Sequence, residues 1–487
     1  MLINSLSFLA FFAIVVVVYF APTVRSKPAR QNLWLLLVSY VFYSLADWRM
    51  VPLLLGATAV FYALGIAVKQ MMNGERWKAA SRLTTLAAAL GVALLLIFKY
   101  LNFFGQSFAT LFNAIGLQMS WTTLNILVPV GVSFFTFKLI SYVVEVHRER
   151  IEPTRDFVQF ATYIAFFPTI MSGPIDRPGK FLPQLMRSHT FDEPLALDGC
   201  RQVLWGIFTK MCIADNLALL TSSAWEMPTD FPASRLLVAA LLFPLQMYTD
   251  FAGYSDMAIG VAKVLGFRVE RNFNHPYLAR NVAEYWRRWH MSLTSWITDY
   301  VFMPLNIAMR DRGRIGTIIA VMINLIVIGL WHGANWTYAL FGLYHGLLFI
   351  PLVFSGSFGR SRKLKPAAHG LPKGSDFLKM LGTYCLVAIG LLIFQAPSLS
   401  HFWAYLRALF RPSLLSIPSM GLPWFTYVGL ILLIACEWLC RDREHPLQFV
   451  HGPAASSRAV RWGIYYVLIL CIFFFQGQSQ QFIYFQF

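Results

Sequence analysis

The sequence is poor in charged residues, and this deficit argues against a soluble protein. Only 13% of its 487 residues are Asp, Glu, Lys or Arg, and 57% are hydrophobic. Soluble domains carry about 25% charged residues. A soluble chain of this length would form two or more domains, each with a polar surface. The sequence has too little polar surface even for one domain, so we predict an integral membrane protein.

Cysteines and common catalytic motifs are also scarce. Cys436 and Cys440 are one helical turn apart, but no second pair or nearby histidine completes a zinc site. Phosphate-binding loops and the Gly-x-Ser-x-Gly nucleophile motif are missing. We therefore expect no metal and no permanently bound cofactor. No basic residue precedes the apolar run 6–20, which we interpret as a retained first span rather than a cleaved signal.

The net charge of +17 does not indicate nucleic-acid binding, because the basic residues fall in short clusters between apolar runs. Cytoplasmic loops of membrane proteins have this pattern. Basic clusters at 25–30, 69–82 and 148–155 follow the first, third and fifth predicted spans. We therefore place these loops in the cytoplasm and Met1 on the extracytoplasmic side.

The apolar runs predict an all-α, polytopic bundle of about eleven to thirteen membrane segments, some of them re-entrant or interfacial. The candidate spans are 6–24, 33–46, 51–68, 83–101, 124–144, 157–171, 235–260, 315–331, 335–354, 377–395, 425–440 and 461–476, with 103–118 and 200–221 as shorter or interrupted segments. We treat 1–487 as one membrane domain, made of N-terminal spans (1–171), a core that carries the motifs (172–354) and C-terminal spans (355–487). Lys99, Lys138 and Lys210 are expected to reach towards the interface.

Ionisable residues at membrane depth are expensive, so they are candidates for function. His332 lies between two apolar runs and next to Gly333, and glycine permits close approach of backbone or ligand. A histidine there can take up and return a proton near neutral pH. The alternative is a structural histidine at a helix end, to which we give about equal weight.

Residues 281–300 predict one amphipathic helix that begins at an Asn281 cap. Its aromatic face carries Trp286 with His290 beside it, and its basic face carries Arg287 and Arg288. Such a helix lies along the membrane surface or between other helices. The simpler interpretation is an interfacial anchor in which His290 only fills space.

Two further groups of polar residues lie in apolar runs. Asp250 and Tyr254 are four residues apart and share a helix face. Asp250 can orient a histidine or line a polar tunnel, or equally form a structural ion pair with an arginine such as Arg287. Tyr344 and His345 are weaker candidates, for which a structural role carries slightly more weight.

At these residues the chain resembles the membrane-bound O-acyltransferases, above all the bacterial branch that acetylates alginate or transfers D-alanine to teichoic acids. The resemblance runs from about 248 to 345 and depends on four motifs in order: Asp250 to Gly260 (DFAGYSDMAIG), Asn272 to Tyr277 (NFNHPY), Tyr285 to Leu293 (YWRRWHMSL) and Trp331 to Trp336 (WHGANW). Tyr285 stands where the family usually has phenylalanine.

The resemblance implies a helical bundle around a tunnel, with His332 as the catalytic histidine and His290 as the second polar position. A thioester donor, acetyl-coenzyme A, would enter from the cytoplasm, and a hydroxyl acceptor would enter from the other side of a bacterial inner membrane. We expect the substrate-binding side chains among Asp250, Tyr254, Trp286, Arg287, Arg288, Asn335, Tyr344 and His345. Arg287 and Arg288 would hold a donor phosphate or, with equal weight, contact lipid headgroups.

The acceptor is expected to be an extracellular polysaccharide, peptidoglycan or a serine of an exported partner of the acetyltransferase or esterase type. His332 would act as general base or carry the acyl group covalently, and both routes stay open. The alternatives are D-alanyl transfer to teichoic acid and a proton-coupled transporter. Polar residues confined to one third of the chain, and the lack of paired broken helices in two related halves, favour the enzyme.

Overall fold

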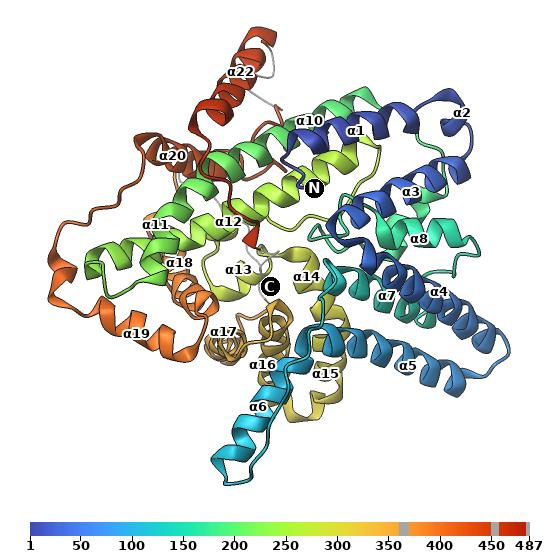
Figure 1. Cartoon of the computed structure of the whole chain (residues 1–487), viewed down its shortest axis with the longest axis horizontal. Helices are drawn as coiled ribbons and strands as arrows, with labels where there is room; N and C mark the ends of the chain where they lie inside the picture. Colours follow the sequence, from blue (N-terminus) through green and yellow to red (C-terminus); the bar gives the residue numbers. More distant parts are fainter. Residues whose placement is uncertain (360–369, 450–456, 484–487) are drawn as a thin grey trace. The chain divides into compact units, whose positions relative to one another are not determined.

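The computed structural model describes residues 1–359, 370–449 and 457–483, and in these residues all regular structure is helical. A helix satisfies its own backbone hydrogen bonds, which lipid cannot do. The helices of the chain are labelled in Figure 1. They group into two compact units. Unit 1 comprises Met1–Val203 and Met257–Glu270, and unit 2 comprises Leu204–Asp256 and Arg271–Phe487. Two long helices, α10 (Glu193–Phe208) and α12 (Ala233–Val264), contribute residues to both units.

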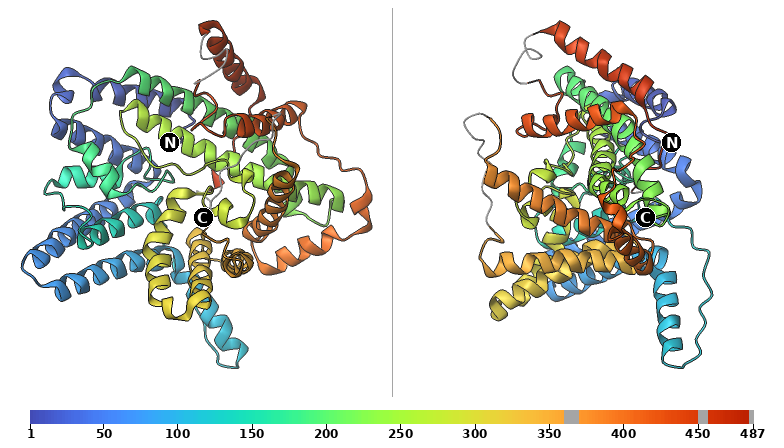
Figure 2. Two further views of the ribbon diagram at one scale, coloured as in Figure 1. Left: turned by 180° about the vertical axis from the view of Figure 1, so that it is seen from behind. Right: turned by 90° about the vertical axis from the view of Figure 1, so that its left-hand side faces the viewer.

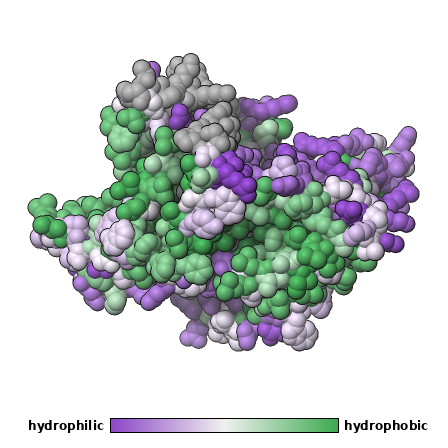
Figure 3. All heavy atoms as spheres, turned by 90° about the horizontal axis from the view of Figure 1, so that it is seen from above, coloured by the Kyte–Doolittle hydropathy of each residue, from purple (hydrophilic) through white to green (hydrophobic). Residues whose placement is uncertain are grey.

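Eight helical runs in the described residues are long and apolar enough to cross a membrane. They are Pro28–Asn73, Trp77–Ala114, Glu193–Glu226, Ala233–Val264, Arg310–His332, Trp336–Phe354, Gly374–Gln395 and Arg458–Phe475. Leu6–Tyr19 and Trp424–Leu439 are shorter apolar helices. Much of the face seen in Figure 3 is hydrophobic, as a surface in contact with lipid must be. The prediction of a polytopic helical membrane protein is confirmed.

Several predicted boundaries differ from the structure. The predicted spans 33–46 and 51–68 belong to one helical run, in which the 3-10 turn Trp48–Met50 joins them. The predicted span 83–101 shares a run with the following segment, which ends at Ala114 and not at 118. The segment 200–221, expected to be interrupted, lies within a run of 34 residues. The span predicted at 124–144 is wrong in its first part, because the helix begins only at Val132. Gly131 precedes it with a left-handed φ of 72°, and a side chain there would collide with the backbone of Ile170.

Unit 1 is built on packing among α3, α4, α5, α7 and α8. Its helical elements are α1 (Leu6–Tyr19), α2 (Pro22–Arg25), α3 (Pro28–Asp47), η1 (Trp48–Met50), α4 (Val51–Asn73), α5 (Trp77–Leu95), η2 (Leu96–Tyr100), α6 (Leu101–Ala114), α7 (Val132–His147), α8 (Phe157–Ala165) and α9 (Pro178–Leu185). The predicted span 157–171 is therefore only the nine-residue α8, followed by turns.

Unit 2 contains every residue of the candidate site. Its helical elements, besides its parts of α10 and α12, are η3 (Thr209–Ala214), α11 (Asp215–Glu226), η4 (Pro276–Leu278), α13 (Val282–Trp286), α14 (Met291–Ile297), η5 (Thr298–Phe302), α15 (Met303–Ala308), η6 (Arg310–Arg312), α16 (Gly313–His332), α17 (Trp336–Phe354), α18 (Gly374–Gln395), α19 (Leu399–Leu409), η7 (Pro412–Leu415), α20 (Trp424–Leu439) and α22 (Arg458–Phe475).

The helices α16 and α17 lie side by side in unit 2 (Figures 1 and 2). Glycines permit this approach, because a side chain at Gly329 would enter the backbone of Tyr338 and one at Gly342 would enter that of Leu325. These pairs run in opposite directions along the chain, so the two helices form an antiparallel hairpin. The hairpin places His332 at the turn between them.

Candidate active site

His332 is the last residue of α16, and its side chain is only 4% exposed. The helix ends there because Gly333 is fully extended, and a side chain at that position would enter the ring of Tyr338. Asn335 then begins α17, since its side-chain oxygen accepts a hydrogen bond from Thr337 N at 3.0 Å. Gly333 and the Asn335 cap therefore fix the position of the histidine.

His290 lies in a break between α13 and α14 and has a left-handed backbone, with φ 44° and ψ 51°. The prediction of one continuous helix over 281–300 is therefore wrong. Asn272 replaces the helical hydrogen bonds. Its carbonyl accepts from Met291 N at 2.8 Å, and its side-chain oxygen accepts from Ser292 Oγ at 2.6 Å. The sequence motif contained Asn272 but gave no sign of this role in holding the His290 loop.

The two histidine rings lie close together, with centroids 6.5 Å apart. This separation is too long for a direct hydrogen bond between the two imidazoles. Aromatic rings surround them: Phe251 lies 4.7 Å and Trp331 5.6 Å from His290, and Phe394 lies 5.0 Å from His332. Burial lowers the pKa of His290 to about 3, so its imidazole is neutral near pH 7. The structure thus brings together the two histidines singled out from the sequence.

His345 lies next to this pair and positions Trp286. Trp286 Nε1 donates a hydrogen bond to His345 Nδ1 at 3.3 Å, so the neutral imidazole carries its proton on Nε2. Phe341 packs against His345 at 4.7 Å and against His332 at 6.5 Å. A side chain at Gly390 would place its Cβ 2.5 Å from His345 Nε2, so the glycine of α18 makes room for this ring. The sequence alone gave no reason to single out Gly390.

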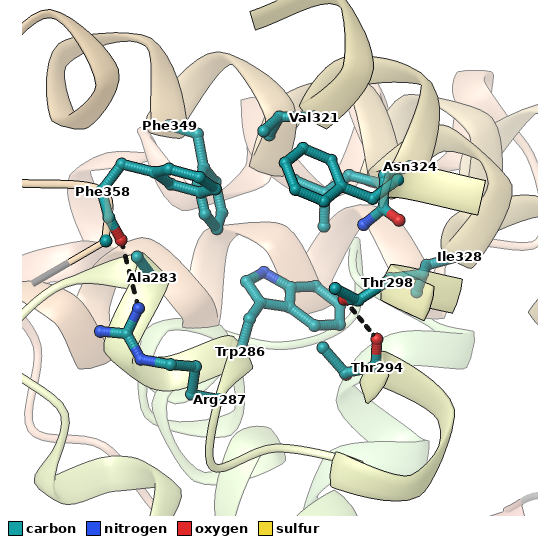
Figure 4. Close-up of a pocket in the computed structure, with 13 residues that line it drawn as sticks. Ala283, Trp286, Arg287, Thr294, Thr298, Val321, Asn324, Ile328, Phe349 and Phe358 are labelled. Carbon is teal, nitrogen blue, oxygen red and sulfur yellow. Dashed lines mark hydrogen bonds between the residues drawn. The ribbon is translucent and has the colours of Figure 1, made fainter. Parts of the chain in front are cut away.

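Trp286 also lines a pocket of about 240 Å³ (Figure 4). It is mainly apolar, with polar groups at Arg287, Thr294, Thr298 and Asn324; its other lining residues are Ala283, Trp286, Phe302, Val321, Leu325, Ile328, Phe349, Phe358 and Gly359. Ile328 precedes His332 by four residues, about 6 Å along α16, and residues at that spacing share a helix face. Apolar walls with a few polar groups are typical of small-molecule sites.

The two neighbouring arginines have different surroundings. Arg287 lines the pocket and donates to the carbonyl oxygen of Phe358 at 3.2 Å (Figure 4). Arg288 instead pairs with Glu284 at 2.8 Å and donates to the backbone carbonyls of Asn274 and His275. Only Arg287 is therefore placed to meet a ligand in the pocket.

Other predicted substrate-binding residues make contacts within the protein. Asp250 forms an ion pair with Lys210 at 2.5 Å, not with Arg287. Tyr344 donates to the carbonyl of Leu386 at 2.9 Å, and the Asn335 amide donates to that of Pro397 at 2.8 Å. Lys210 is only 1% exposed, so the prediction that it extends to the interface is wrong. Its two acidic partners, Asp215 and Asp250, are buried with it and lie 5 and 40 positions away in the sequence.

Comparison with known proteins identifies the family. The model of the membrane-bound O-acyltransferase family matches residues 40–366. The chain is 34% identical over 435 residues to a probable alginate O-acetylase, AlgI, of Pseudomonas aeruginosa, covering 88% of this chain and 80% of that protein. It is 30% identical to the peptidoglycan O-acetyltransferase of Helicobacter pylori, covering 66% and 64% of the two chains.

A teichoic acid D-alanyltransferase of Bacillus subtilis is 29% identical, covering 57% of this chain and 71% of that protein. The O-acetylating relatives thus match more of the chain than this D-alanylating one does. Together with the helical spans, these similarities show that the chain belongs to the membrane-bound O-acyltransferase family and is an O-acyltransferase.

Proposed function

We propose that the enzyme moves an acetyl group from a cytoplasmic thioester, acetyl-coenzyme A, to a hydroxyl group on the extracytoplasmic side of the bacterial inner membrane. The observation that supports this most is the buried pair of His290 and His332. An apolar pocket is lined by Ile328, one helical turn before His332. The extent of similarity to acetylating relatives favours acetyl over D-alanyl transfer.

In the proposed reaction His332 acts as the general base. Its imidazole takes the proton of the acceptor hydroxyl as the oxygen attacks the thioester carbonyl carbon. The carbon–sulfur bond then breaks, and the leaving thiolate takes the proton from the imidazolium, so protons balance. His290, neutral because it is buried, helps to orient the substrate carbonyl or the hydroxyl. A covalent acyl-His332 intermediate gives the same products in two steps.

The pocket is proposed as the site of the donor's thioester arm. Its volume of about 240 Å³ suits the acyl group and the adjoining thiol arm, and not the whole nucleotide. Arg287, at the edge of this pocket near Phe358, would meet a phosphate of the donor, because guanidinium binds phosphate through two parallel hydrogen bonds.

The acceptor is proposed to be a secreted polysaccharide, or a hydroxyl on an exported partner of the acetyltransferase or esterase type that passes the acetyl group on. The name of one relative, a probable alginate O-acetylase, supports the first choice. In the second case, the partner would select the polymer.

The test is acyl transfer by purified protein. Replacing His332 with Ala should reduce turnover of acetyl-coenzyme A in the presence of an acceptor by about 10²- to 10⁴-fold, the usual contribution of a general base. The turnover is measured by the release of free coenzyme A thiol. Size-exclusion chromatography of the variant shows whether it is folded. Wild-type turnover by a folded His332→Ala protein would refute the assignment. Turnover of a D-alanyl carrier-protein thioester in place of acetyl-coenzyme A would instead support the D-alanyl alternative.

A further inference from the structure

A second polar cluster lies buried in unit 2, and the proposed reaction does not use it. Lys210 Nζ lies 2.7 Å from Asp215 and 2.5 Å from Asp250, and none of the three side chains is more than 5% exposed. We call these three residues the socket. Buried charges in a membrane helix are expensive and are kept where they have a task. Lys210 also lies in η3, a π-helical turn, a distortion often found at functional sites.

The socket holds the segment 476–483 that follows α22. Lys210 Nζ donates to the carbonyl of Gln480 at 3.1 Å, and Ile483 N donates to Asp250 Oδ2 at 2.8 Å. The ring of Phe482 lies 4.6 Å from the Lys210 ammonium, and cation and ring attract at this distance. Gly477 N donates to Met211 O at 2.8 Å. Charged side chains of the socket and the backbone of the neighbouring Met211 therefore both hydrogen-bond to this segment.

One turn of α12 connects the socket to His290. Asp250 and Tyr254 share one helix face, where Asp250 meets Lys210 and Tyr254 packs on Phe482 at 5.0 Å. Phe251 and Ser255 follow these two residues by one position each, and they contact His290 and Asn272. Phe251 packs on His290 at 4.7 Å.

Ser255 completes the connection. Its Oγ accepts a hydrogen bond from Asn272 Nδ2 at 3.0 Å, and Asn272 holds the His290 loop. The same turn of α12 is thus fixed to the socket on one face and supports His290 on the other.

We propose that Lys210 is a positioning residue for acyl transfer, which acts by fastening α12 and the segment 476–483 so that Phe251 and Asn272 hold His290 in place. This inference rests on the proposed function, because it takes His290 as part of the reacting centre. A shift of about 1 Å at a reacting group can reduce the rate about 10²-fold, so support of this kind has a measurable effect.

The first experiment follows the segment itself. Ile483→Cys puts a thiol at a buried position and keeps the backbone hydrogen bond to Asp250. Its rate of reaction with N-ethylmaleimide is measured by mass spectrometry of the peptide that contains residue 483. Adding Lys210→Met should speed this labelling about tenfold, because the segment then opens more often. The matched control is Lys263→Met, which breaks another ion pair, Lys263 with Asp198 at 2.7 Å, in unit 1, and should leave the rate unchanged.

The second experiment asks whether Lys210 acts through His290. Lys210→Met should lower kcat for acyl transfer roughly 10- to 100-fold with little change in the KM of the donor. In a His290→Ala background the same substitution should cost much less, because residues that act as a unit are not additive. A purely structural role would give equal losses in the two backgrounds.

Asp250→Asn keeps the measurement possible if Lys210→Met does not fold. It leaves Lys210 and Asp215 as a balanced pair and keeps an oxygen for Ile483 N. We expect a smaller loss of kcat in the same direction. Unchanged labelling and unchanged kcat in these variants, or a loss that is equal in the His290→Ala background, would overturn the proposal. If the parent transfers no acyl group, the proposed function fails, while the labelling rates still decide whether the socket holds the segment.

Discussion

His290 has two unfavourable features: a left-handed backbone conformation and a fully buried imidazole ring. A left-handed backbone suits glycine or asparagine better than histidine and costs of order 1 kcal/mol or more for most other residues. The ring is also fully buried, which disfavours its charged form. Strained backbone of this kind persists where the surrounding structure holds it, here through Asn272, and is frequent at functional sites.

The pKa of His290 leads to a prediction about pH. Its folded-state pKa of about 3 lies below the unfolded value of about 6.5, so its stabilising contribution is present above pH 6.5 and is lost as the pH falls towards 3. At pH 5 this loss amounts to roughly 2 kcal/mol. His290→Asn tolerates the left-handed backbone and does not titrate. The variant should therefore lose less stability than the wild type between pH 7.5 and pH 5, as measured by thermal unfolding in detergent.

The control is the wild-type protein in the same detergent, in which every other titrating group is retained. An equal fall in Tm for both proteins would mean that His290 does not contribute to the acid sensitivity, and the neutral, buried state assigned to it would be incorrect.

Among the elements, the α16–α17 hairpin depends on glycines at its contact surface. In Gly342→Ala the new methyl group would collide with the backbone of Leu325 and Ile326, which cannot move aside as a side chain can. We expect the free energy of unfolding to fall by roughly 1–3 kcal/mol. We also expect slower acyl transfer, because the hairpin carries His332. Thermal unfolding and turnover measure the two effects.

Gly382→Ala in α18 is the matched control. This glycine also lies within a helix, but nothing lies within 4 Å of the position that its Cβ would take. The stability of the Gly382→Ala protein should be unchanged or slightly higher, because alanine favours the helix more than glycine does. Equal losses in the two variants would show that the collision at Gly342 does not account for the loss of stability in Gly342→Ala.

The sequence predicted helices well where long apolar runs dominate, and it failed where tertiary contacts decide the local structure. The pattern at 281–300 has helical periodicity, yet the helix breaks at His290 because Asn272 takes over its backbone hydrogen bonds. Periodicity describes which face is apolar, but it contains no information on a partner 18 residues earlier in the chain.

The candidate site shows the same limit. His332 and His290 were found from the sequence because ionisable residues are rare in apolar runs. The sequence also singled out Lys210 but not its ion pair with Asp250, because that pairing depends on how α12 packs. Gly390 gave no signal at all, since its importance comes from the ring of His345 that faces it.

For the whole molecule, the distribution of basic residues predicts the orientation in the membrane. The loop near Lys78 should be cytoplasmic and the turn at Arg49 extracytoplasmic. Both positions are exposed. In intact spheroplasts a membrane-impermeant maleimide should modify Arg49→Cys above the background of the native cysteines. It should modify Lys78→Cys only after the membrane is opened. The reverse pattern would place Met1 in the cytoplasm.

The aromatic rings around His332 and His290 have a further consequence. A thioester next to a general base is at risk from water, which is a hydroxyl compound too and far more concentrated than any sugar. Phe251, Trp331 and Phe394 leave little room for bulk solvent beside the two imidazoles. Exclusion of water suppresses such wasteful side reactions. In the proposed reaction, this enclosure would select which nucleophile reaches the acyl group.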